Sequence, residues 1–256
     1  MKLLLDVGNS RLKWAWLSTD GLVGSGHATH RKDGLSEVLA DLLRNCALPD
    51  EVRVANVAGP AAAALVAEAV SARFGRSAVF ARSRDAAYGL RNGYRDPAQL
   101  GVDRWLAMCA VWQKFSGPLC VVDAGTAVTI DVITADGAHS GGLILPGMSL
   151  MAAALRQDTG DLDRLAGRES ADMLTVGTRD RYSLGSDTSS AIRLGAMRAI
   201  AALVADCLDA LNADTRLMMT GGDGAQLARL IDIPAVFDPD LVLEGLALEP
   251  ACYSAS

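Results

Sequence analysis

The sequence lacks several features that mark other classes of protein. Its 256 residues show no excess of basic side chains, since 24 Lys and Arg stand against 30 Asp and Glu, for a net charge of −6. Dedicated nucleic-acid-binding proteins are usually basic, so we expect no nucleic-acid partner. The most apolar long stretch, residues 54–67, is interrupted by Pro60 and is too short to cross a bilayer, so we expect no membrane span.

Disulfide, metal-binding and secretion patterns are also missing. The five cysteines are far apart, odd in number and without a CxxC pair, which predicts reduced thiols. The three histidines show no metal-ligand spacing, and we expect surface positions for all of them: His27, His30 and His139. Asp6 ends the first apolar run too early for a signal peptide. We therefore expect a cytoplasmic protein.

Charge is unevenly distributed along the chain. Residues 1–118 carry a net charge of +4 and residues 119–256 a net charge of −10, with six arginines between Arg76 and Arg104. Such a stretch could attract an anionic substrate. On charge alone, an ordinary solvated surface is the better interpretation.

The strongest positive signal is an internal repeat. Residues 3–21 and 120–137 both run from an apolar strand into Asp-x-Gly-(Asn/Thr), continue as a β-rich run and end at Asp-Gly. The Asp-Gly pair begins 14 residues after Asp6 but 13 after Asp123, so the second copy is one residue shorter. Asp-Gly between apolar runs is a hairpin signal, and a third strand is expected after each turn, at 22–28 and 138–145.

Helices and strands alternate after each three-stranded unit. Apolar spacing predicts helices near 34–45, 60–74, 98–115, 147–157, 187–211 and 223–231, and strands near 52–57, 77–80, 215–220 and 235–237. Two successive β-β-β-α-β-α-β units predict an α/β protein of two duplicated domains. We expect these domains to be residues 1–118 and 119–256, divided near the turn-forming Ser-Gly-Pro at 116–118.

The first candidate motif is Asp-Val-Gly-Asn-Ser at 6–10. Gly8 permits a positive φ and close approach to a phosphate, Lys13 adds a positive charge, and Asp6 suits a hydrated Mg²⁺. An ordinary hairpin turn explains this copy equally well. The second copy, Asp-Ala-Gly-Thr at 123–126, favours function, because a turn does not require its carboxylate to be repeated. Neither copy is a P-loop, since GxxxxGK[ST] is absent.

Two further glycine-containing motifs precede helices. In Gly-Val-Asp-Arg at 101–104, Asp103 could be a helix cap or the carboxylate that accepts a substrate proton during phosphoryl transfer. Thr-Gly-Gly-Asp-Gly at 220–224 follows an apolar strand. Its glycines could approach a nucleotide, or Asp223 could simply cap the helix.

In this order, and together with the Gly-Gly-Leu-Ile-Leu-Pro-Gly block at 141–147, these motifs resemble those of the type III pantothenate kinases. The resemblance runs from Asp6 to about Gly245. It implies two ribonuclease H-like domains of the actin, sugar kinase and heat-shock chaperone ATPase superfamily. It also implies ATP-dependent phosphorylation of pantothenate to 4′-phosphopantothenate, the first step of coenzyme A biosynthesis.

The resemblance further implies roles for individual residues. Asp103 would accept the substrate proton, Asp6 would hold Mg²⁺ through water, and Asp123 would hold a monovalent cation, K⁺ or NH₄⁺. Adenosine would lie against Gly221 and Gly222. ATP phosphates would contact Asp6, Val7, Gly8, Asn9, Ser10, Arg11, Leu12, Lys13 and Thr126. Pantothenate would contact Tyr94, Gly101, Val102, Asp103, Arg104 and Thr188, the last across the interface of a homodimer.

Two other functions are compatible with the same fold. One is a kinase for another small hydroxylated substrate, such as a sugar or a short acid. The Gly-Val-Asp-Arg block and the short chain argue against it. The other is a nucleotide-binding regulatory protein without turnover. Asp103 argues against that interpretation, because binding alone does not need a base.

Overall fold

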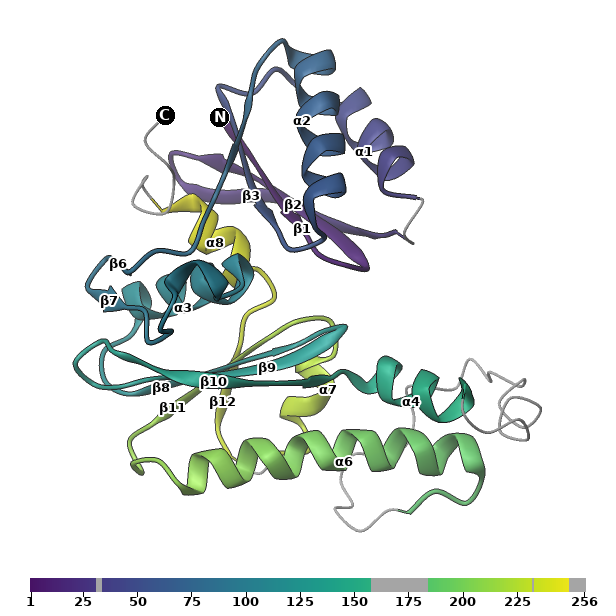
Figure 1. Cartoon of the computed structure of the whole chain (residues 1–256), viewed down its shortest axis with the longest axis vertical. Helices are drawn as coiled ribbons and strands as arrows, with labels where there is room; N and C mark the ends of the chain where they lie inside the picture. Colours follow the sequence, from purple (N-terminus) through teal and green to yellow (C-terminus); the bar gives the residue numbers. More distant parts are fainter. Residues whose placement is uncertain (31–33, 158–183, 232, 249–256) are drawn as a thin grey trace. The chain divides into compact units, whose positions relative to one another are not determined.

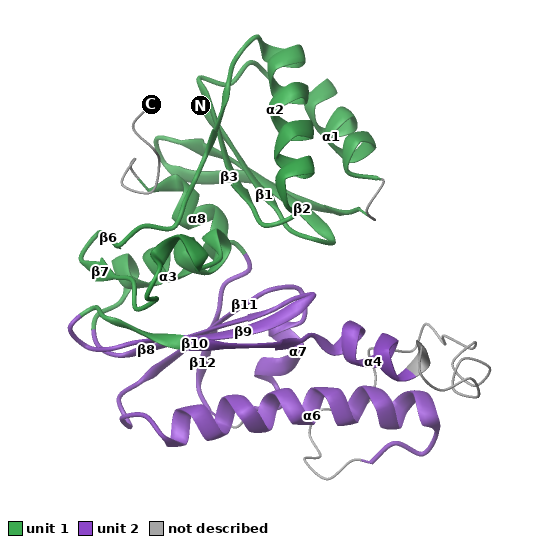
Figure 2. Ribbon diagram, viewed as in Figure 1, with its two compact units in different colours: residues 1–116, 137–141, 240–256 green, residues 117–136, 142–239 purple. Residues whose placement is uncertain are grey.

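The computed structural model describes residues 1–30, 34–157, 184–231 and 233–248 (Figure 1). The chain divides into two compact units (Figure 2). The first holds Met1–Ser116, Gly137–Gly141 and the chain from Asp240, and the second holds Gly117–Asp136 and Gly142–Pro239. This division departs from a single boundary at 118/119, because residues 137–141 and helix α8 (Leu241–Ala247) pack with the first unit.

The first unit is built on a five-stranded sheet of order β3-β2-β1-β4-β5. Its strands are β1 (Lys2–Val7), β2 (Arg11–Ser18), β3 (Gly21–Thr29), β4 (Glu51–Asn56) and β5 (Ala78–Phe80). The first three form an antiparallel meander, whereas β4 and β5 run parallel to β1. Helices α1 (Leu35–Arg44) and α2 (Pro60–Phe74) make the crossovers. Strands β1 and β2 were predicted within the repeat at 3–21 without separate bounds, and the other elements of this sheet were predicted to within two residues.

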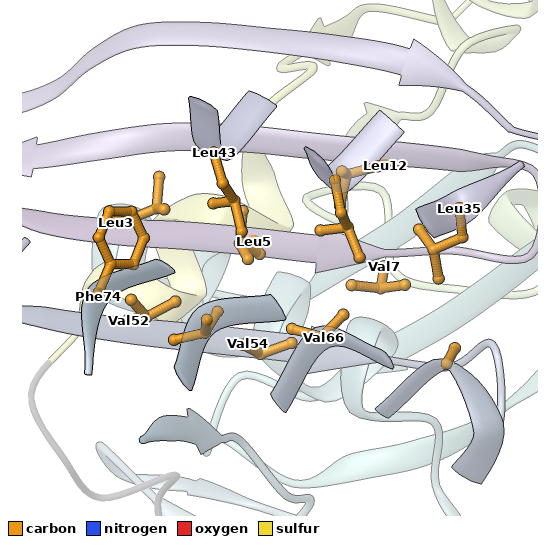
Figure 3. Close-up of a cluster of buried hydrophobic side chains, with 13 residues drawn as sticks. Leu3, Leu5, Val7, Leu12, Leu35, Leu43, Val52, Val54, Val66 and Phe74 are labelled. Carbon is orange, nitrogen blue, oxygen red and sulfur yellow. The ribbon is translucent and has the colours of Figure 1, made fainter. Parts of the chain in front are cut away.

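Alternation along β1 separates the two faces of this sheet. Leu3, Leu5 and Val7 are fully buried in an apolar cluster with α1 and α2 (Figure 3). Burial of each such side chain contributes about 1.5–3 kcal/mol to stability. Leu4 and Asp6 point to the opposite face, since successive strand residues alternate. The strand therefore presents the Asp6 carboxylate on the face away from α1 and α2.

Helix α8 is anchored to the first sheet by a buried arginine. Arg53 on β4 is only 2% exposed. One of its amino groups donates to the carbonyl oxygens of Leu246 and Leu248 at 3.0 and 2.8 Å. Its Nε pairs with Glu51 at 3.0 Å. Arg53 thereby supplies partners for carbonyl groups that the end of a helix leaves unpaired.

Helix α8 also packs closely on α3 (Val102–Lys114). A Cβ on Gly245 would lie 2.3 Å from the carbonyl oxygen of Leu106, so only glycine allows this approach. Lys114 and Glu244 form an ion pair between the two helices. Helix α8 was not predicted from the sequence, although it links β1 and β4 to the helix that begins at the Gly-Val-Asp-Arg motif.

The segment between β5 and α3 contains a small hairpin, β6 (Ala86–Ala87) and β7 (Leu90–Arg91), and a 3₁₀ turn, η1 (Pro97–Gln99). The backbone N–H of Arg91 donates to the carbonyl oxygen of Gly137 at 2.8 Å. Residues 137–141 are thereby attached to the first unit.

The second unit repeats the same strand order, β10-β9-β8-β11-β12. Its strands are β8 (Leu119–Ala124), β9 (Ala127–Ile133), β10 (His139–Pro146), β11 (Arg216–Thr220) and β12 (Ala235–Phe237). Its helices are α4 (Met148–Gln157), α6 (Thr188–Asp209) and α7 (Gly224–Ala228). The predicted duplication is confirmed. Helix α7 is shorter than the 223–231 expected.

One face of the second sheet packs against α6 and α7 in an apolar cluster. Cys120 lies in it, and burial raises the pKa of its thiol to about 12. The four cysteines within the described residues form no disulfide, as predicted, and Cys252 lies outside them. In the part of the chain that the structure describes, no helix is long and apolar enough to cross a bilayer.

Candidate active site

The first Asp-x-Gly hairpin joins β1 to β2. Asp6 lies opposite Lys13 in the antiparallel ladder, so the two side chains share one face. The N–H of Gly8 donates to the carbonyl oxygen of Arg11 at 3.0 Å. Gly8 does not adopt a positive φ, so that expectation is wrong. Glycine contributes space here instead, because a Cβ would lie 3.2 Å from the Arg11 oxygen.

Side chains of this hairpin differ in what they can offer a ligand. Val7 and Leu12 are fully buried in the core, so only their backbone atoms could contribute to an ATP site. Asn9 and Arg11 are exposed, and Ser10 is half-buried. The run from 6 to 13 therefore divides into core positions and outward positions.

Two neighbouring segments of the first unit form hydrogen bonds to carbonyl groups of the hairpin. The N–H of Val57 donates to the carbonyl oxygen of Val7 at 3.1 Å. His30 follows β3, and its ring Nε2 lies 3.1 Å from the carbonyl oxygen of Gly8. Its backbone N–H donates to the carbonyl oxygen of Ser10 at 2.9 Å. The hairpin is thus fixed at three carbonyl groups.

The expectation of surface histidines holds only for His27, which is exposed. His30 is 6% exposed and His139 is 3% exposed. Both are buried because each packs against a segment distant in sequence, which composition alone does not reveal.

The second hairpin joins β8 to β9. Asp123 lies opposite Thr129. The N–H of Gly125 donates to the carbonyl oxygen of Ala127 at 3.0 Å. Three residues lie between the last paired positions here, against four in the first hairpin. The missing residue of the second repeat is therefore lost from the turn. Thr126 is exposed, and its carbonyl oxygen accepts from the N–H of Gly147 at 2.9 Å.

Gly221 lies directly against the second hairpin. It has φ +87°, and a Cβ there would lie 2.4 Å from both the Ala124 carbonyl oxygen and an Asp123 carboxylate oxygen. The N–H of Asp223 donates to the same Ala124 oxygen at 2.9 Å. Asp223 is the N-cap residue of α7, but its side chain makes no capping hydrogen bond, so the cap interpretation of this motif is not supported. Gly222 is exposed beside it.

Asp103 lies in the first turn of α3. Its carboxylate bends back toward Gly101, where a Cβ would lie 2.7 Å from Oδ1, and the N–H of Arg104 donates to that oxygen at 2.8 Å. Negative charge is favourable at a helix N-terminus. A side chain at position 101 would displace this carboxylate, so glycine there preserves its orientation.

The buried Arg104 pairs with the half-buried Tyr94 beside Asp103. An Arg104 amino group donates to the Tyr94 hydroxyl at 2.8 Å, and the guanidinium carbon lies 5.5 Å from the ring centre. The ring of His139 stacks on Tyr94 with centres 5.8 Å apart and planes 16° apart. Sequence reasoning missed His139, because no motif joins the start of β10 to residue 94.

The loop that carries Tyr94 is fixed by Asn92. Its side-chain oxygen accepts from the N–H of Tyr94 at 3.0 Å, and its amide donates to Arg84 and Pro97 carbonyl oxygens at 3.1 and 3.3 Å. A Cβ on Gly93 would lie 1.8 Å from the carbonyl oxygen of His139. Glycine and asparagine together therefore set the position of the tyrosine.

The structure assigns the predicted site residues to both units. The first unit contains residues 6–13, Tyr94 and residues 101–104. The second contains Asp123, Thr126, Gly221, Gly222 and Thr188. Thr188 is the first residue of α6, behind a capping box between Asp187 and Ser190.

Within the described ranges, no three His, Cys, Asp or Glu side chains gather as a metal centre. Mg²⁺ that enters a site with a nucleotide is usually held by one or two carboxylates plus the phosphates. Asp6 offers one such carboxylate.

Comparisons with known proteins converge on one family. The family model described as type III pantothenate kinase matches residues 2–210. A type III pantothenate kinase of Nitrosococcus oceani is 35% identical, covering 96% of this chain and 92% of its own. One of Cupriavidus pinatubonensis is 37% identical, covering 95% and 96%.

Solved structures show the same fold. A chain from Campylobacter jejuni described as a Baf family transcriptional activator has a TM-score of 0.58 at 25% identity, covering 95% of this chain and 94% of its own. A chain from Sinorhizobium meliloti described as a 2-dehydro-3-deoxygalactonokinase has a TM-score of 0.57 at 11% identity, covering 96% and 97%. The second likeness concerns the fold alone, and it agrees with the predicted sugar kinase and actin-like class.

Proposed function

The chain belongs to the type III pantothenate kinase family, and we propose that it transfers the γ-phosphoryl group of ATP to pantothenate. The products are 4′-phosphopantothenate and ADP, in the first step of coenzyme A biosynthesis. The single observation that supports this reaction is the position of the Asp103 carboxylate, which lies against Gly101 and beside the Arg104–Tyr94 pair.

In the proposed reaction, Asp103 accepts the proton of the primary hydroxyl of pantothenate. The hydroxyl oxygen forms a bond to the γ-phosphorus while the bond from that phosphorus to the bridging β-γ oxygen breaks, and ADP leaves. Phosphoryl transfer depends mainly on positioning and charge stabilisation. Arg104 supplies a fixed cation and Tyr94 a flat ring, which suit a small acid that carries a hydroxyl group.

The two hairpins would hold ATP. The outward positions of residues 6–13 and Thr126 contact the phosphates, and Gly221 and Gly222 contact the adenosine. Asp6 would hold Mg²⁺ through water, which supplies charge neutralisation for the phosphates. Asp123 would hold K⁺ or NH₄⁺. The proposal is supported by the place of this carboxylate in the repeated hairpin, where the Gly221 backbone approaches so closely that a Cβ would lie 2.4 Å from an Asp123 carboxylate oxygen.

We propose a homodimer in which Thr188 reaches the pantothenate of the partner subunit. Several large apolar side chains of the second unit are exposed on β10, α4 and the residues before α6: Leu143, Ile144, Leu150, Leu155 and Leu184. Exposed apolar groups of this kind commonly mark protein interfaces. Mixing Asp103→Asn and Thr188→Ala subunits should restore activity through hybrid dimers. A monomer by sedimentation at micromolar concentration would contradict the proposal.

The function is tested by measuring ADP release from MgATP with pantothenate, sugars and short acids, with mass spectrometry of the product. We expect release only with pantothenate. Turnover of a sugar alone would favour a different kinase, and nucleotide binding without turnover would favour a regulatory protein. We propose a cytoplasmic location for the protein, since the proposed reaction consumes ATP.

A further inference from the structure

Two carbonyl groups of the first hairpin are held by one residue outside the motif. His30 places Nε2 3.1 Å from the Gly8 carbonyl oxygen, and its backbone N–H donates to the Ser10 carbonyl oxygen at 2.9 Å. A carbonyl oxygen only accepts, so the ring nitrogen that faces it carries the hydrogen. His30 is 6% exposed, so its side chain is largely shielded from water.

Because the Gly8 carbonyl belongs to the same peptide group as the Asn9 N–H, the contact with His30 also determines where that N–H points. In a trans peptide, the C=O group and the following N–H group point to opposite sides. The described residues contain no cis peptide bond. With the Gly8 carbonyl turned toward His30, the N–H of Asn9 is directed to the other side of the turn. The hydrogen bond from His30 also polarises that peptide and strengthens the Asn9 N–H as a donor.

We propose that His30 is a positioning residue that directs the Asn9 N–H toward a phosphate group of the bound nucleotide. This inference rests on the proposed function, and it extends the phosphate site beyond the sequence motif, which ends at Lys13. The second hairpin achieves its support differently. There the Ala124 and Thr126 carbonyl oxygens accept from backbone N–H groups of Asp223 and Gly147. The first hairpin therefore depends on a side chain, that of His30, which substitution can remove.

The test compares His30→Leu with His30→Gln, whose side-chain amide can still donate to Gly8. Calorimetry with ADP and steady-state kinetics should show nucleotide Kd and the KM for ATP raised about 3- to 10-fold in His30→Leu, the usual worth of one hydrogen bond. The KM for pantothenate and kcat should change little. His30→Gln should recover most of the affinity. Thermal unfolding of both variants reports on folding.

Unchanged ADP affinity in a folded His30→Leu variant overturns the proposal, and so does an equal loss for ADP and pantothenate, which marks a general structural role. If His30→Leu does not fold, the proposal is tested by hydrogen exchange in the wild-type protein. ADP should slow hydrogen exchange at the Asn9 amide, and unchanged exchange overturns the inference. A wild-type protein that binds no nucleotide at all contradicts the proposed function itself.

Discussion

The two Asp-x-Gly hairpins have the same place in their sheets but different surroundings. In the first, Asp6 faces Lys13 across the ladder, four residues form the turn, and His30 supports it. In the second, Asp123 faces the neutral Thr129, three residues form the turn, and Gly221 lies against the carboxylate. Duplication preserved the strand and the carboxylate, whereas the charge opposite and the means of support diverged.

From this difference we propose different roles for the Asp6 and Asp123 carboxylates. Asp6 has a cationic side chain as its cross-strand neighbour, so the first hairpin contains its own positive charge. In the second hairpin a monovalent cation would supply the charge that Lys13 supplies in the first. Both hairpins would then bind the nucleotide, and neither would perform the proton transfer.

The largest expected effect lies outside both hairpins. Asp103→Asn should lower kcat by about 10²–10⁴, the usual contribution of a general base, because the amide cannot accept the hydroxyl proton. ADP affinity, measured by calorimetry, should stay near the wild-type value. Near-normal kcat in this variant, together with complete loss in Asp123→Asn and unchanged cation dependence, would assign the base to the second hairpin instead.

The next effect separates Asp6 from Asp123. Asp123→Asn should raise the KM for ATP and flatten the response of the rate to added K⁺ or NH₄⁺, because the amide lacks the charge that holds the cation. Asp6→Asn should instead raise the Mg²⁺ concentration needed for half-maximal rate. Titrations of KCl, NH₄Cl and MgCl₂ measure both, with NaCl at equal ionic strength as the control. Identical titration curves for the two variants would remove the distinction.

A smaller effect compares the two glycines. Gly221→Ala should cost roughly 1–3 kcal/mol of unfolding free energy, because its φ is positive and its Cβ would lie 2.4 Å from a backbone oxygen. Gly8→Ala should cost less than about 1 kcal/mol, since its φ is not positive and the nearest atom would lie at 3.2 Å. Urea unfolding checks both values. The reverse order would show that the second turn tolerates displacement better than its geometry indicates.

The smallest effect concerns the turn hydroxyls. Ser10→Ala and Thr126→Ala should each raise the KM for ATP by about 2- to 10-fold, the range for loss of one hydrogen bond, with kcat unchanged. Thr126→Ser, which keeps the hydroxyl, is the matched control for the second hairpin. An unchanged KM in Thr126→Ala would leave only main-chain contacts at that turn.

Much of the fold could be predicted because its signals are local. Asp-Gly turns, alternating apolar residues and 3–4 spacing predicted both three-stranded meanders and most helices. The one-residue difference between the copies was also visible before the structure located it in the turn. The hairpin β6–β7 was missed because its strands contain two residues each, too few for any periodic pattern.

The parts of the site that could not be predicted depend on distant contacts. His30 is buried by a hairpin 22 residues earlier, and His139 by Tyr94, 45 residues earlier. No periodicity reports such pairings. Likewise, the conformational argument for Gly8 was wrong, because the sequence shows that glycine is present but not whether torsion or space requires it. Gly93 and Gly245 show the same limitation, since only the facing carbonyl oxygens explain them.

The late position of α8 has a consequence for how the chain folds during synthesis. Strands β1–β4 leave the ribosome long before α8, so the first sheet forms without the helix that covers its second face. Until then Arg53 has no carbonyl groups of Leu246 and Leu248 to bind, and α3 has no partner at Gly245. Contacts between residues about 190 positions apart close slowly. A nascent chain should therefore keep the α3 side of its first unit exposed to chaperones until α8 has been synthesised.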